Sequence, residues 1–104
     1  MPKPELFDVV ELLVNLPEHD QPIGAQGAIV ECHDSENFEV EFANELGETV
    51  ALCPLSSNQF IVVWKSATKQ WLSISEKISA IIEQLSENKQ EEILHYVRLV
   101  YQKA

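Results

Sequence analysis

The sequence predicts a mainly β fold that ends in α-helices. Residues 38–42 alternate between apolar and acidic side chains, and this period of two marks a strand with one buried and one wet face. Other β-rich segments recur up to residue 64, separated by glycine, proline and polar turns. From residue 74 onward there is no glycine or proline, and apolar residues recur every three or four positions. The chain therefore changes from strands to helices between residues 64 and 74.

Five short strands are expected, at residues 6–14, 28–33, 38–43, 48–53 and 60–64. The first is predicted to be mostly buried, because its apolar residues do not alternate cleanly. A long polar loop follows it, and the other connections are only a few residues each. Five short strands connected in this way are typical of an SH3-like barrel.

Several residues predict the geometry of the turns and strands. Gly24 and Gly27 bracket a corner, where glycine permits a positive φ or a close approach of two backbones. Gly47 is expected in the left-handed conformation within a later turn. Pro54 is expected to end the fourth strand, because proline cannot donate into a ladder. Alternation along the second strand gives one face to Ala28, Val30 and Cys32.

Two helices with a very short connection are predicted at the C-terminal end, forming an α-helical hairpin. Ser73 and Glu76 fit a capping box at the start of the first helix. Ser86 is expected to cap the second, with Glu87 in its first turn. Each helix carries an apolar stripe: Ile74, Ile78, Ile81, Ile82 and Leu85 in the first, and Ile93, Leu94, Val97, Val100 and Tyr101 in the second.

The charge is distributed unevenly over the expected units, which are a barrel at 1–65, a linker at 66–73 and a hairpin at 74–104. The whole chain of 104 residues has a net charge of −10. Residues 1–65 carry two basic and twelve acidic side chains, whereas residues 66–104 carry five of each. Nucleic acids and anionic membranes are bound through basic patches, so we expect neither as a partner. The acidity fits a protein partner with a basic surface, or solubility alone, which is the commoner reason.

The sequence also predicts a cytoplasmic location. No apolar run is long enough to span a bilayer, and the first residues show no signal-peptide pattern. Two cysteines in a chain of this kind are expected to be reduced thiols.

No catalytic residue, metal site or cofactor is expected. Cys32 and His33 are adjacent, so on a strand they point to opposite faces and cannot act together. Cys32 and Cys53 are interpreted as buried structural thiols. Glu39 and Glu41 form a pair of carboxylates, but catalysis needs a cleft that separates their pKa values. As a function for this pair, a docking face for a basic partner is a better hypothesis than catalysis.

Interface residues are predicted among the aromatic and surplus apolar side chains. Trp64 and Trp71 flank the linker, so they are expected to attach the tail to the barrel, although tryptophan also anchors interfaces. Tyr96 and Leu99 fall outside the apolar stripe of the second helix, which suggests a homodimer or another partner. Partial exposure without function is the alternative. The full set of interface candidates is Glu39, Glu41, Trp64, Trp71, Tyr96, Val97, Leu99 and Tyr101.

An ordered set of motifs in the first part of the chain resembles the DUF4926 family. These motifs are LFDVVEL at 6–12, LPE at 16–18, GAQGAIVE at 24–31, FEVEF at 38–42 and GETVAL at 47–52. The resemblance spans about residues 5–64 and implies a small bacterial protein with an SH3-like barrel. Members of that family usually stop near the end of the fifth strand, so the helical tail departs from the pattern.

The tail has a separate likeness, carried by QLSENKQEEILHYV at 84–97. This segment is similar to the helical hairpin of DUF2281-type and antitoxin-like small bacterial proteins, although Ser86 stands where those have proline. The likeness implies an interaction or antitoxin role, and neither family transfers a catalytic residue.

The sequence therefore predicts a non-enzymatic protein–protein interaction module. The leading hypothesis is an antitoxin or inhibitor of a bacterial toxin-like partner. The alternative is an accessory subunit that stabilises a larger assembly.

Overall fold

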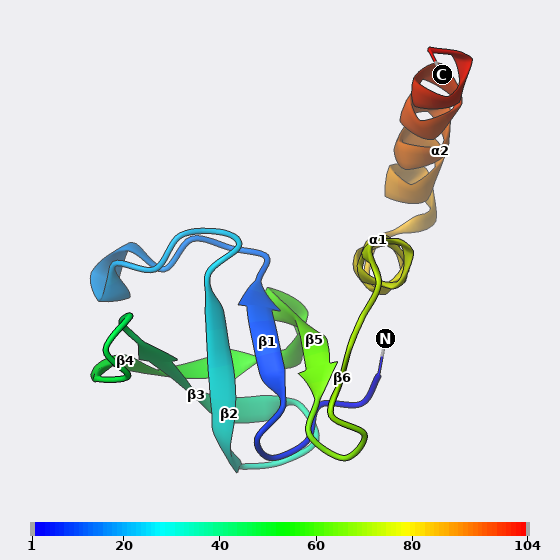
Figure 1. The fold of residues 1–104 in the computed structure, drawn as a ribbon. Helices are drawn as coiled ribbons and strands as arrows, with labels where there is room; N and C mark the ends of the chain where they lie inside the picture. The colour runs from blue at the N-terminus through cyan, green and yellow to red at the C-terminus, as the bar shows by residue number, and fades with distance from the viewer. Residues whose placement is uncertain (1, 104) are drawn as a thin grey trace.

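The computed structural model describes residues 2–103 as a curled antiparallel sheet followed by two helices (Figure 1). The five expected strands and both expected helices are present. A sixth strand lies within residues 66–73, where the sequence predicts a linker. The elements are β1 (Val9–Leu12), β2 (Gln26–Cys32), β3 (Asn37–Ala43), β4 (Thr49–Ser56), β5 (Phe60–Lys65), β6 (Gln70–Trp71), α1 (Ile74–Ile82) and α2 (Glu87–Gln102), with 3-10 turns at Pro17–His19 and Ser57–Gln59.

The strands form one sheet in the order β4-β3-β2-β1-β5-β6. Every neighbouring pair is antiparallel, and β1 is central because it pairs with both β2 and β5. The sheet is open, with β4 and β6 as its edges, and it has six strands where the sequence predicts five. The extra strand arises because a tight turn after β5 lets Lys69 N donate to Lys65 O and brings residues 70–71 back alongside it.

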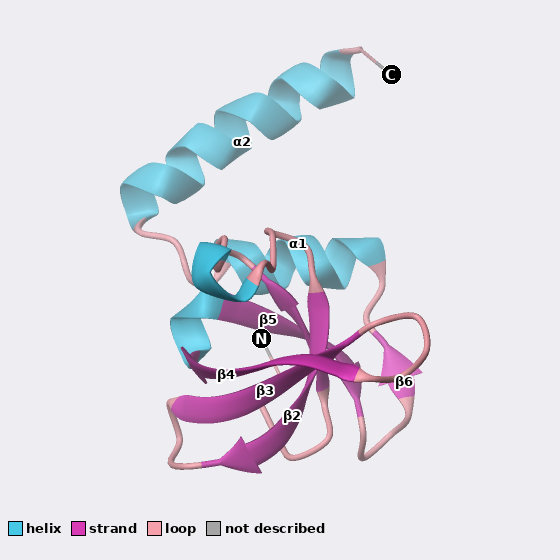
Figure 2. Ribbon diagram, turned by 90° about the vertical axis from the view of Figure 1, so that its left-hand side faces the viewer, coloured by secondary structure: helices cyan, strands magenta, loops and turns pink. Residues whose placement is uncertain are grey.

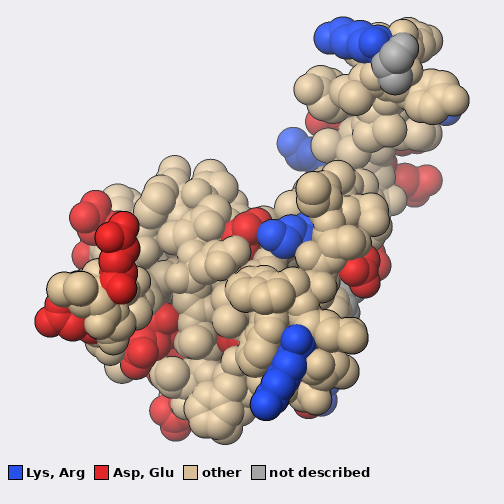
Figure 3. All heavy atoms as spheres, in the orientation of Figure 1, with Lys and Arg blue, Asp and Glu red and all other residues tan. Residues whose placement is uncertain are grey.

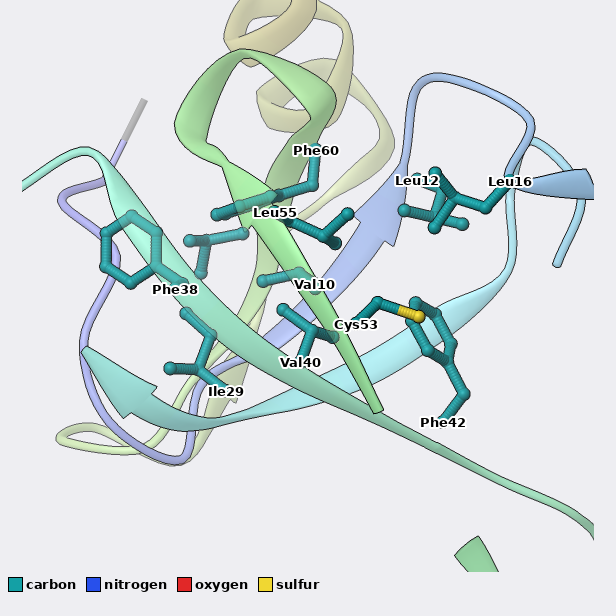
Figure 4. Close-up of a cluster of buried hydrophobic side chains, with 11 residues drawn as sticks. Val10, Leu12, Leu16, Ile29, Phe38, Val40, Phe42, Cys53, Leu55 and Phe60 are labelled. Atoms are coloured by element: carbon teal, nitrogen blue, oxygen red, sulfur yellow. The ribbon is translucent and has the colours of Figure 1, made fainter. Parts of the chain in front are cut away.

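The main hydrophobic core lies inside the curl of the sheet (Figure 4). The alternation predicted for β3 is confirmed: Phe38, Val40 and Phe42 are buried, while Glu39 and Glu41 are half-buried on the other face. The rings of Phe38 and Phe60 pack edge to face with centroids 5.7 Å apart. The core consists of Val10, Leu12, Leu16, Ile29, Phe38, Val40, Phe42, Cys53, Leu55, Phe60 and Val62.

The inward face of β2 is set by Gly27 and Ile29, and both are buried. Ala28 points away from the core, like its partner Glu41, whereas Cys32 stands opposite the buried Phe38, so the expected single face of Ala28, Val30 and Cys32 does not form. Cys32 is nevertheless exposed, and the prediction that it is a buried thiol is wrong. A register shift between β2 and β3 after Ile29 accompanies the change from buried to exposed residues.

Pro54 lies inside β4, so the expectation that it ends the strand is wrong. The strand continues to Ser56, and Pro54 stands opposite Glu39 of β3. A proline is tolerated here because β4 is an edge strand, and on such a strand a missing N–H that faces the unpaired side breaks no ladder hydrogen bond.

The two faces of β5 are both covered. Phe60 and Val62 point into the main core, while Ile61 and Val63 pack against Ala80 of α1. Helix α1 therefore forms a second layer on the outer face of β1 and β5 (Figure 2). Its start is fixed by the predicted capping box, in which Glu76 N donates to Ser73 Oγ and Ser73 N donates to Glu76 Oε1.

A buried ion pair ties the N-terminal segment to the end of β5. Asp8 is fully buried, and Lys65 Nζ donates to Asp8 Oδ2 at 2.6 Å and to Glu5 Oε1 at 2.7 Å. The other carboxylate oxygen, Asp8 Oδ1, accepts from the backbone N–H of Ser66 at 2.8 Å. Burial opposes the charged form of Lys65, but the hydrogen bonds and charges of Asp8 and Glu5 outweigh burial and raise the pKa of Lys65 above 10.5.

Gly27 fits only because it lacks a side chain. A Cβ at this position would lie 2.8 Å from both Glu41 O and Val40 Cγ1 of β3. We predict that Gly27→Ala lowers the free energy of unfolding by about 2 kcal/mol, because the overpacked strands must move apart. Urea denaturation checks this. Ala43→Ser, at the exposed end of β3, is the control and should cost less than about 0.5 kcal/mol.

Replacing Lys65 by methionine leaves Asp8 buried without its cation, and we predict a loss of about 3 kcal/mol near pH 7. Because the folded-state pKa of Lys65 is raised, its contribution is fully present below the ordinary pKa of 10.5 and is lost as the pH rises through the folded-state value. As the pH is raised from 7, the difference in unfolding free energy between wild type and Lys65→Met should therefore narrow only above 10.5.

The control for this pair is Glu5→Gln, which changes an exposed carboxylate and should cost less than about 1 kcal/mol. The prediction is contradicted if the difference in unfolding free energy between wild type and Lys65→Met, followed upward from pH 7, begins to narrow well below about pH 10.

Candidate protein-interaction surface

Helix α2 projects from the rest of the molecule and lies beyond α1 (Figures 1 and 2). It has 16 residues, none of them buried. The two helices are joined by a short connection, as the sequence predicts, but they diverge from the junction and do not pack as a closed hairpin. The interface candidates on α2 are all exposed: Tyr96, Val97, Leu99 and Tyr101.

The apolar residues of α2 occupy one broad side of the helix. At 100° per residue, Ile93, Val97 and Val100 lie along the centre of this side, with Leu94 and Tyr101 at one flank. Tyr96 lies at the other flank and Leu99 beyond it, as the sequence predicts. We call the side carrying Ile93, Leu94, Tyr96, Val97, Val100 and Tyr101 the α2 apolar face.

Where the helices meet, the α2 apolar face borders an open hollow of about 490 Å³. Ile82 of α1 lines the hollow together with Ile93, Leu94 and Val97. The same stripe of α1 continues away from the junction through Ile78 and Ile74, which are 49% and 78% exposed. An apolar wedge therefore opens between the two helices.

Only one side of α1 packs on the sheet. Ala80 and Ile81 contact the sheet, and Lys77 lies 3.9 Å from Glu11 of β1, so these residues mark the inner side. Ile74 and Ile78 lie toward the outer side and are exposed. Sequence periodicity identified the stripe but could not show which part of it faces the sheet.

Trp64 and Trp71 lie opposite each other on β5 and β6, away from α2. Their ring centroids are 6.3 Å apart with a tilt of 54° between the planes. Trp64 is half-buried, whereas Trp71 is 58% exposed. The contact holds β6 against β5 directly before α1 begins, so the pair connects the helical part to the sheet.

The acidic candidates Glu39 and Glu41 lie on the outer face of the sheet and are not brought together with α2. Glu39 Oε1 is 3.3 Å from His33 Nε2, and Glu31, the cross-strand partner of Glu39, is 4.0 Å from His33 Nδ1. Acidic atoms gather around the β3–β4 end of the molecule, whereas α2 carries both signs (Figure 3). This His33 cluster is not among the candidates predicted from the sequence, although Glu31 and His33, two positions apart on β2, share one face and signal it.

The other side chains considered for metal binding or catalysis give little support for either within residues 2–103. No group of three or more His, Cys, Asp or Glu side chains is arranged there to hold a metal ion. Burial raises the pKa of the Cys53 thiol, which disfavours its reactive thiolate. Asp34 lies in a turn, where the backbone N–H of Glu36 and the side-chain amide of Asn37 donate hydrogen bonds to its carboxylate. These hydrogen bonds lower the pKa of Asp34. No helix in the same range has the length and apolarity needed to cross a membrane.

Because α2 buries no residue, we predict that a chain ending after Leu85 keeps its folded sheet and α1. The free energy of unfolding, extrapolated to low protein concentration, should change by less than about 1 kcal/mol. Near-UV circular dichroism of the two tryptophans in urea measures it. Ala80→Asp in the full chain is the contrasting variant and should cost about 3 kcal/mol or more, because it places a charge against Ile61 and Val63.

The chain was compared with known proteins and protein families. No curated protein and no solved structure matches it. A family model described as "Domain of unknown function (DUF4926)" matches residues 6–62, from the turn before β1 into β5. The match leaves β6 and both helices outside. Because it covers more than half of the chain and confirms the resemblance seen in the sequence motifs, the protein belongs to the DUF4926 family.

Proposed function

We propose that this protein is a non-enzymatic protein–protein interaction module that binds through the α2 apolar face. The observation that carries the proposal is a helix of 16 residues with seven large apolar side chains and none of them buried. An isolated helix of this length is marginal in water, and most helical stability in proteins comes from packing an apolar face. A partner that covers the face supplies this packing.

The sheet supports a second, electrostatic contact. Strands β1 to β5 belong to the segment that holds the whole net charge of −10, and acidic side chains gather at the β3–β4 end. In this proposal the sheet is an SH3-like barrel in the cytoplasm of a bacterium, and its acidic face docks on a basic protein surface. An antitoxin or inhibitor of a toxin-like partner combines these two requirements.

The alternative proposal is an accessory subunit that stabilises a larger assembly. The separation of the acidic sheet face from α2 favours it, because two surfaces at opposite ends of a molecule can contact two different proteins. Expression beside a neighbouring gene distinguishes the two proposals. An antitoxin neutralises a product that is toxic alone, whereas an accessory subunit is recovered in one large complex without such a neighbour.

We predict that Val97→Asp abolishes partner recovery in affinity purification from the native host followed by mass spectrometry. The added carboxylate lies at the centre of the α2 apolar face and cannot be desolvated there without a large cost. The near-UV spectrum should stay that of wild type, because Val97 touches no buried core. Asn88→Asp, on the polar side of the same helix, is the matched control and should keep the partner. Recovery of the same proteins with Val97→Asp contradicts the proposal.

A further inference from the structure

Hydrogen bonds link the two helices at the base of the wedge between α1 and α2. Gln90 Nε2 of α2 donates to Ile82 O at 3.1 Å and to Leu85 O at 3.2 Å. These bonds use the carbonyl groups of the last residue of α1 and of the connection after it, and they brace the start of α2. Beyond this point the helices diverge, so the outer stripe of α1 and the α2 apolar face are both uncovered.

The charges of α2 are divided along its length. Residues 87–94 carry three glutamates and one lysine, whereas residues 95–103 carry Arg98, Lys103 and no acidic side chain. The helix dipole accounts for Glu87 and Lys103 at the two ends, but its effect fades within the first and last turns. Glu91, Glu92 and Arg98 lie further inside the helix, so their arrangement calls for a separate explanation.

We propose that the wedge is occupied by α2 of a second copy of this chain, packed antiparallel. This inference rests on the proposed role of α2 as a binding surface and specifies its partner. In an antiparallel pair related by a two-fold axis, the acidic half of each helix faces the basic half of the other. At 100° per residue, Glu92 and Lys103 lie beside Tyr96, so Glu92 approaches Lys103 of the second copy along that flank. Glu91 and Arg98 lie beyond Leu94 on the other side, farther from the helix contact, where their opposite charges attract over a longer distance.

The apolar residues fit the same arrangement. Val97 lies near the middle of α2, so the two copies of its apolar face overlap along most of their length. Each α2 also lies against the exposed stripe of the other copy's α1, through Ile74 and Ile78. Four helices then share one core, as in a helical bundle.

Overall charge does not prevent this association, although each chain carries a net charge of −10. Residues 66–104 are neutral in sum, and the acidic strands lie at the other end of the molecule (Figure 3). A parallel pair, in contrast, sets the glutamates of one α2 beside those of the other, and this repulsion selects the antiparallel orientation.

Light scattering of the purified full chain tests the proposal. We expect a mass of about twice 11.8 kDa. The double variants Glu91→Lys/Glu92→Lys and Arg98→Glu/Lys103→Glu should each self-associate about tenfold more weakly, because like charges then face each other. An equimolar mixture of the two should regain wild-type association as a mixed dimer. The control Glu18→Lys/Glu45→Lys makes the same charge change at exposed sites away from the helices and should remain a wild-type dimer.

Two results overturn the proposal. A wild-type mass of one chain shows that α2 closes on its own α1 or awaits a different protein. Weak association of the mixed double variants shows that the charges do not pair in the antiparallel register. Neither result touches the proposed function, which fails only if Val97→Asp still recovers the same host proteins.

Discussion

The burial of β5 on both faces is the constraint on which the rest of the structure depends. Four consecutive residues of this strand, at 60–63, are fully buried. Phe60 and Val62 close the core inside the curled sheet, so Ile61 and Val63 point to the outer face, where they need a cover. Helix α1 supplies that cover through Ala80, whose small side chain lets the helix lie close to the strand. The sheet therefore requires the second layer, which α1 forms.

The exposure of α2 follows from the same constraint. Because α1 turns Ala80 and Ile81 toward β5, its remaining apolar positions, Ile74 and Ile78, lie toward the outer side. The chain then leaves α1 at Ile82 and enters α2 after a connection of only four residues, on that outer side. From there α2 cannot reach the sheet, which is already covered by α1. Its apolar face therefore does not pack on the sheet, and this distinguishes it from an amphipathic helix at the edge of a core.

The sequence predicts the local features well and the non-local ones poorly. Alternation in β3, the left-handed Gly47, the Ser73 capping box and the Ser86 cap depend on neighbouring residues, and each is confirmed. Pro54 and Cys32 were assigned wrongly because their environments depend on strand order and register, which no local pattern contains. The wedge was missed for a similar reason: spacing identifies an apolar stripe but not which part of it faces the sheet. One signal was available, since the unbroken apolar run 60–64 indicates a strand covered on both faces.

The choice of interface candidates on α2 has a physical basis in the sequence, and their role in binding stays a prediction. Tyr96, Val97, Leu99 and Tyr101 were singled out because α2 has more apolar side chains than one packed face needs, and a surplus of this kind is independent of the tertiary fold. Glu39 is a weaker interface candidate, because its carboxylate already contacts His33 and is less available to a basic partner. The exposed helix is therefore the stronger candidate for a binding surface. The acidic sheet face acts over longer distances and depends on salt, so it suits the orientation of an encounter more than the stability of a complex.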